Sequence, residues 1–118
     1  MGAVHRRRPD GSWDGVPPRP YGDGGRRHEL IATDRYGLRY FEVPPGGTTT
    51  LERHGHDHGV VLQRGRARVT LGDETHELGP GDVVYVAPGE LHSFQAIGDE
   101  PLAFICVRSG GDAAGSSG

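Results

Sequence analysis

The sequence predicts an all-β protein, a single small antiparallel sandwich or barrel, and three observations support this fold class. No window has sustained apolar spacing of three and four residues, so no long helix is expected. Glycine or proline interrupts the chain about every ten residues. Between these breaks lie short runs rich in β-branched and aromatic residues, the pattern of a small all-β domain.

The candidate strands follow one another with only turns between them. Gly72-Asp73 separates two alternating runs and predicts a two-residue hairpin. Similar signals occur at 44–47, at 79–81 and at Pro88-Gly89. The expected strands are 28–34, 37–43, 48–54, 58–64, 66–71, 74–78, 82–87, 91–97 and 102–108.

The chain of 118 residues is long enough for one domain with one core. We expect residues 1–27 to be a largely flexible segment, partly docked around 13–21 through Trp13 and Tyr21. The barrel is expected at 28–108. Residues 109–118 are mostly glycine, serine and alanine, which predicts a flexible tail.

Composition excludes several classes of function. A net charge of -3 gives no electrostatic basis for binding nucleic acid or a membrane. All 13 basic residues are arginine, which excludes chemistry that needs a lysine amine. There is no apolar segment of signal-peptide or membrane-spanning type, so we expect a cytoplasmic protein. The single cysteine, Cys106, lies in an apolar run and is expected to be a buried thiol.

A metal site is indicated by the segment from Glu52 to His58, which holds three histidines and two carboxylates in seven residues, and by His92 further on. In an extended chain, side chains two residues apart point to the same face, so Glu52, His54 and His56 could converge. Imidazole together with carboxylate suits Fe, Mn, Zn, Ni or Cu. The segment runs directly into the apolar residues 60–62, so we expect the site to be built into the core.

Two stretches of the sequence resemble the motifs of the cupin superfamily, whose members are small jelly-roll barrels. The second cupin motif, G-x5-P-x-G-x2-H-x3-N, is matched by residues 81–92 at Gly81, Gly89 and His92. The chain departs from it at Ala87 and Ala96, and neither departure removes a ligand. The resemblance covers roughly residues 38–107 and implies an antiparallel jelly-roll barrel.

The first cupin motif, G-x5-H-x-H-x3,4-E-x6-G, can be aligned in two registers. If Gly65 is the closing glycine, His58 takes the place of the glutamate, with His54 and Glu52 at the two histidine positions. In the other register His54 and His56 form the H-x-H pair, with His58 third. Both registers imply that His54, His58 and His92 bind metal, while Glu52 and His56 compete for the fourth place.

By the same resemblance, the metal has open positions that face an apolar cavity. We expect one divalent transition metal, with Fe or Mn favoured and Zn, Ni or Cu possible. His56 and Glu42 are the polar residues expected to contact substrate, and both are candidate catalytic groups. From strand alternation, the expected cavity residues are Tyr40, Val60, Leu62, Phe94, Phe104 and Cys106.

Three functions are compatible with such a site. The favoured one is an Fe- or Mn-dependent oxygenase acting on a small molecule. The second is a redox-neutral isomerase, lyase, cyclase or rearrangement enzyme that uses Zn, Ni or Mn as a Lewis acid. The third is a binding module without catalysis. A fold alone does not decide between them. We expect a homodimer, because small barrels commonly pair through an edge strand.

Overall fold

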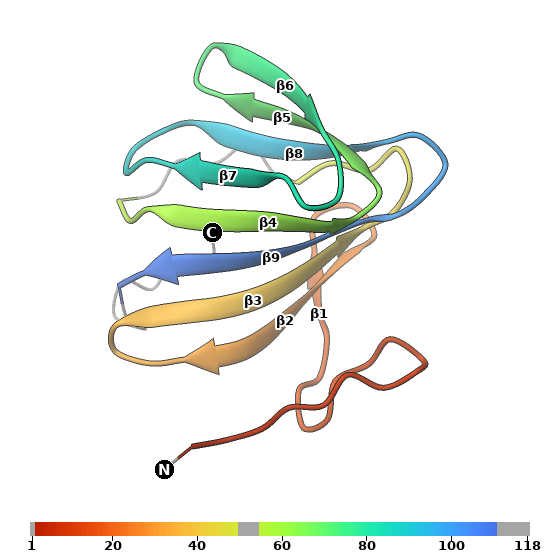
Figure 1. Ribbon diagram of the computed structural model, residues 1–118, viewed down its shortest axis with the longest axis vertical. Helices are drawn as coiled ribbons and strands as arrows, with labels where there is room; N and C mark the ends of the chain where they lie inside the picture. Colours follow the sequence, from red (N-terminus) through yellow and green to blue (C-terminus); the bar gives the residue numbers. More distant parts are fainter. Residues whose placement is uncertain (1, 50–54, 111–118) are drawn as a thin grey trace.

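The computed structural model describes residues 2–49 and 55–110, and in this part the chain forms two antiparallel β-sheets (Figure 1). The larger sheet has the order β1-β2-β3-β9-β4-β7 and the smaller has the order β6-β5-β8. The strands are β1 (Arg19–Tyr21), β2 (Gly25–Ala32), β3 (Tyr36–Val43), β4 (His58–Arg64), β5 (Arg66–Leu71), β6 (Glu74–Leu78), β7 (Val83–Val86), β8 (His92–Ile97) and β9 (Leu102–Ser109). The predicted all-β fold class is therefore confirmed, and no helix occurs in the described residues.

Most strands begin and end within about a residue of their predicted limits, because glycine turns separate them. The hairpin between β5 and β6 turns at Gly72-Asp73, as predicted, with Gly72 at a φ of 61°. Of the expected strand 48–54, the structure describes only Thr48 and Thr49. Thr48 pairs with Gln95 of β8, and the Thr49 amide donates to the Phe94 carbonyl at 2.8 Å.

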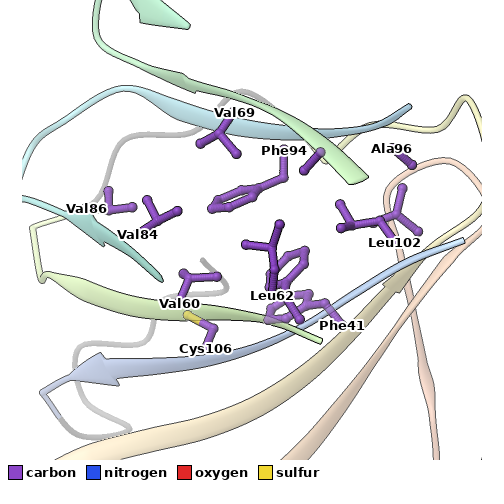
Figure 2. Close-up of a cluster of buried hydrophobic side chains, with 13 residues drawn as sticks. Phe41, Val60, Leu62, Val69, Val84, Val86, Phe94, Ala96, Leu102 and Cys106 are labelled. Carbon is purple, nitrogen blue, oxygen red and sulfur yellow. The ribbon is translucent and has the colours of Figure 1, made fainter. Parts of the chain in front are cut away.

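The main core fills the space between the two sheets (Figure 2). At its centre three phenylalanine rings stack: Phe104 lies between Phe41, with ring centroids 5.0 Å apart, and Phe94, at 4.8 Å. Such stacked pairs contribute about 0.5–1.5 kcal/mol each beyond their buried area. Because the rings come from β3, β9 and β8, the column joins one sheet to the other.

A second, smaller core lies on the outer face of the large sheet, where the N-terminal segment covers β2 and β3. Val16 is buried there with Leu30 and Tyr40. The Trp13 ring meets the Tyr40 ring edge-on at 5.8 Å, and the Arg7 guanidinium lies 4.5 Å from the centre of the Tyr40 ring. Strand β3 is thus covered on both faces, by the main core on one side and by the N-terminal segment on the other.

Strand formation starts earlier than the sequence predicts. β2 begins at Gly25 and pairs with a short edge strand, β1, which no prediction anticipated. No helix in the described residues is long and apolar enough to cross a membrane.

Candidate metal and substrate site

One end of the space between the sheets opens into a narrow cavity with room for about 20 Å³ inside, or about 330 Å³ when the open space at its mouth is included. Its walls are mostly apolar, and the polar groups on them are few and close together. The lining residues are Tyr21, Arg39, Phe41, Thr49, His58, Val60, Val86, His92, Phe94, Phe104 and Cys106. An apolar cavity with a small number of convergent polar groups is the usual form of a small-molecule site.

Two histidines reach this cavity from opposite sheets. His58 is the first residue of β4 and His92 is the first residue of β8. Both side chains are buried, and their ring centroids lie 5.4 Å apart. His92 is placed by the turn before β8, where the Glu90 amide donates to the Ala87 carbonyl at 3.1 Å.

His56 extends the histidine cluster, with its ring centroid 4.8 Å from that of His58. Asp57, the residue between them, points away and is held by three hydrogen bonds. Its amide donates to Ser109 Oγ at 3.3 Å, its carbonyl accepts from the Ser109 amide at 3.1 Å, and its carboxylate accepts from the Tyr85 hydroxyl at 3.0 Å. Hydrogen bonding from the Ser109 side chain, and after it from the Tyr85 hydroxyl, keeps the pKa of the Asp57 carboxyl below its usual value. The three hydrogen bonds fix the chain so that His56 and His58 share one side.

The protonation of His92 fits a metal ligand. Its Nδ1 lies 2.9 Å from the Glu90 carbonyl oxygen, which can only accept, so Nδ1 carries the proton and Nε2 carries the lone pair. A hydrogen bond of this kind orients most metal-binding histidines. His58 Nδ1 lies 3.3 Å from Cys106 Sγ, which can donate or accept, and 3.5 Å from Arg39 Nη2, which can only donate.

The described residues alone do not complete a metal site. Within 2–49 and 55–110, no group of three or more histidine, cysteine or carboxylate side chains is arranged to hold a metal ion. Two of the predicted ligands, Glu52 and His54, lie outside the described residues. The donor set of His58 and His92, with His56 beside them, therefore fits part of a site for a transition metal.

Arg39 is the charged group of the cavity. It lies on β3, is completely buried, and places Nη2 3.4 Å from Cys106 Sγ and 3.5 Å from His58 Nδ1. Its guanidinium carbon also lies 5.3 Å from the centre of the Phe41 ring. No pattern in the sequence predicted a role for Arg39 in the site.

Cys106 is a buried free thiol, as its apolar surroundings predicted. Burial raises the pKa of the thiol, and the nearby Arg39 only partly opposes this effect. A neutral, enclosed thiol should be inert as a nucleophile.

We expect Cys106 in the native protein to react with a disulfide reagent such as DTNB at least about 100-fold more slowly than in denaturant, because reaction must await opening of the barrel. The measurement is the absorbance of the released thiolate over time. The control is Val83→Cys in a Cys106→Ala background, since Val83 is 70% exposed and should react at once. Fast native labelling of Cys106 would show that the cavity admits the reagent.

Only some of the predicted cavity residues line the cavity. Val60, Phe94, Phe104 and Cys106 do line the cavity. Leu62 also points between the sheets but lies in the closed core away from the cavity. Contact of any of these residues with a substrate stays a prediction.

Two inward placements need correction. Tyr40 lies on the outer face of β3 against the N-terminal segment, and Glu42, on the same face, forms an ion pair with Arg26 at 3.4 Å. The prediction assigned the wrong set of alternate residues in β3 to the inward face, because both faces of this strand carry apolar side chains. The inward residues are Arg39 and Phe41.

A family model described as a cupin domain matches residues 39–108, more than half of the chain. The chain belongs to the cupin family. The matched cupin region includes most of β3, all of β4 to β8, most of β9, and every histidine of the cluster described above.

This cupin is similar to proteins with different stated functions. Over 70 residues it is 46% identical to the 1-methylthio-D-xylulose 5-phosphate methylsulfurylase of Rhodospirillum rubrum, a match that covers 59% of this chain but only 45% of that protein. A cupin 2 conserved barrel domain protein from Rhodopseudomonas palustris has a TM-score of 0.78 at 34% identity, covering 91% of this chain and 80% of the other. The polyketide cyclase RemF from Streptomyces resistomycificus has a TM-score of 0.74 at 28% identity, covering 92% and 79%.

Proposed function

We propose that this cupin is a metal-dependent enzyme acting on a small molecule bound in the barrel cavity. The observation that carries the proposal is the cluster of buried imidazoles of His58 and His92, with His56 beside them, at the wall of an apolar cavity. Solvated surface histidines are not built this way.

In this proposal His58 and His92 would hold the metal, and the remaining ligands would come from His54 and from Glu52 or His56. The metal would supply Lewis acidity or redox chemistry at the positions left open to the cavity. The protein's own contribution is to hold the imidazoles in one protonation state and to exclude water. The stacked Phe41, Phe94 and Phe104 rings provide the apolar wall for this purpose.

Two kinds of chemistry remain candidates. An Fe- or Mn-dependent oxygenase is the form favoured by the sequence. The redox-neutral form is supported by the similarity to a polyketide cyclase at 28% identity. The match covers only 45% of the methylsulfurylase, so that protein's reaction is not assigned to this chain.

Metal binding tests the proposal directly. After dialysis against EDTA, we expect the protein to take up about one equivalent of Fe(II), Mn(II) or Zn(II), measured by equilibrium dialysis with elemental analysis under anaerobic conditions. Uptake should fall as the pH is lowered, because protons compete with the metal for the ligand atoms. Uptake below a tenth of an equivalent at micromolar metal would contradict the proposal.

The two kinds of chemistry are separated by metal and oxygen dependence. Candidate substrates are incubated with the Fe-, Mn- and Zn-loaded protein, with and without air. An oxygenase should turn over only with Fe or Mn and only in air. Equal turnover with Zn under anaerobic conditions would make the redox-neutral reaction the correct one.

A further inference from the structure

The buried Arg39 has hydrogen-bonding capacity that the protein does not use. A guanidinium carries five N–H donors and stays charged at any physiological pH. Within the described residues, only Nη2 has polar contacts: it lies 3.4 Å from Cys106 Sγ, a weak acceptor, and 3.5 Å from His58 Nδ1. Nε and Nη1 are buried and have no hydrogen-bond partner among the described residues.

No carboxylate of the described residues neutralises Arg39. Glu29 lies directly across from it on β2, but its carboxylate is engaged by Arg27 Nε at 3.3 Å. The titratable groups that contact it are His58 and Cys106, neither of which is an anion in its expected state, and the buried Arg108 near Cys106 is a second cation. A buried cation without a counter-ion is unfavourable, so the position of Arg39 on the wall of the cavity calls for an anion.

We propose that Arg39 is the substrate-binding residue of the cavity, and that it binds an anionic oxygen group, a carboxylate or a phosphate monoester, on a small molecule. The group's oxygens accept from Nη1 and from the N–H groups beside it, in the charge-assisted geometry that arginine favours. This inference deepens the proposed function, because it names the class of substrate that the same cavity selects. Neutral and cationic molecules do not bind at Arg39 in this proposal.

The arrangement also explains how a strand whose other inward side chains, Phe41 and Val43, are apolar can hold an arginine. The guanidinium lies against the Phe41 ring, which stabilises the cation without consuming its N–H donors. The next inward residue, Phe41, begins the stacked column on which an apolar part of the substrate could rest. A carboxylate or phosphate on Arg39 would thus be anchored beside His58, with the remainder of the molecule in the cavity.

The test is a titration of metal-free protein observed by NMR at the arginine side-chain N–H signals. The probes are oxalate, malonate and inorganic phosphate, with malonamide as the neutral counterpart of malonate. We expect a saturable shift of the Arg39 Nε signal with at least one anion and none with malonamide. The carboxylate and phosphate arms show which oxygen group the site prefers.

Substitution then assigns the binding to this side chain. Arg39→Met keeps an apolar side chain of similar length and should weaken anion binding by more than about tenfold, measured by calorimetry. Arg39→Lys keeps the charge but loses the planar fork, and should bind at an intermediate level. The control is Arg68→Met, which removes the same charge from an exposed position paired with Glu77 and should bind as the original protein does.

The outcomes separate this inference from the proposed function. If the anions shift Arg39 in protein that takes up no metal, the inference stands and the metal-dependent function fails. If metal binds but no anion gives a saturable Arg39 response, with or without metal, the inference is overturned. Unchanged anion affinity in folded Arg39→Met also overturns it. Should Arg39→Met not fold, the titration of the original protein and the Arg39→Lys variant still decide.

Discussion

Replacing His92 or His58 with alanine is expected to abolish stoichiometric metal binding. Structural sites with four protein ligands provide roughly 10–16 kcal/mol of apparent binding free energy, so each ligand contributes about 3–4 kcal/mol. Loss of one imidazole should therefore raise the dissociation constant by a factor of roughly 10²–10³. The measurement is competition with a chelating dye, using Zn(II) because it needs no protection from oxidation.

His76→Ala is the matched control, since it removes the same side chain from the surface. His76 lies on the small outer hairpin, half exposed, and its ring contacts only the Glu74 carboxylate at 3.3 Å in the described part of the chain. Its loss should leave metal affinity unchanged. Full occupancy with the original affinity in His92→Ala would contradict the ligand assignment, because a site that loses one of its ligands should bind the metal more weakly.

The same assay decides between the two registers of the first motif. His56 lies close to His58, which is compatible with a fourth ligand but also with a substrate contact. Glu52 lies outside the described residues, so only the sequence supports it. Whichever of Glu52→Ala and His56→Ala loses more metal affinity identifies the fourth ligand. If neither does, His54, His58 and His92 bind the metal with water alone.

The sequence predicted the strands well because their limits are set locally. Glycine and proline turns bound each run, and the two-residue turn at Gly72-Asp73 needs only its neighbours to form. The edge strand β1 was missed for the converse reason. It has three residues, one of them Pro20, and it exists only because β2 offers a partner edge.

The site was predicted in part, and the errors came from strand β3. Alternation assigns inward residues only when one face of a strand is polar, as in β8, where His92 and Phe94 point inward and Ser93 and Gln95 are less buried. In β3 the N-terminal segment covers the outer face, so Tyr40 is as buried as Phe41. In such a strand an arginine is expected to face solvent because it is charged. The signal that would have identified Arg39 is its position two residues before Phe41, which places both side chains on the same face of the strand.

Gly65→Ala is expected to destabilise the barrel by about 3 kcal/mol or more, the largest effect on stability of any single methyl group added to a described glycine turn. Gly65 is the only residue between β4 and β5, where the chain leaves the large sheet for the small one. Its φ of 75° is unfavourable for any other residue, and an added Cβ would lie 2.3 Å from the Pro101 carbonyl oxygen and 3.0 Å from its carbon. Both obstacles are backbone atoms, which cannot rotate away.

Gly46→Ala separates the two causes of this loss. Gly46 has nearly the same backbone angle, a φ of 79°, but an added Cβ meets nothing within 4 Å. It should therefore cost only the unfavourable backbone conformation, about 1 kcal/mol. Both variants are compared with the original protein by urea unfolding in EDTA, so that metal binding does not contribute. A Gly65→Ala variant no less stable than Gly46→Ala would mean that the β4–β5 crossover shifts freely, and that the close approach of Gly65 to Pro101 does not fix how the two sheets, and with them His58 and His92, face each other.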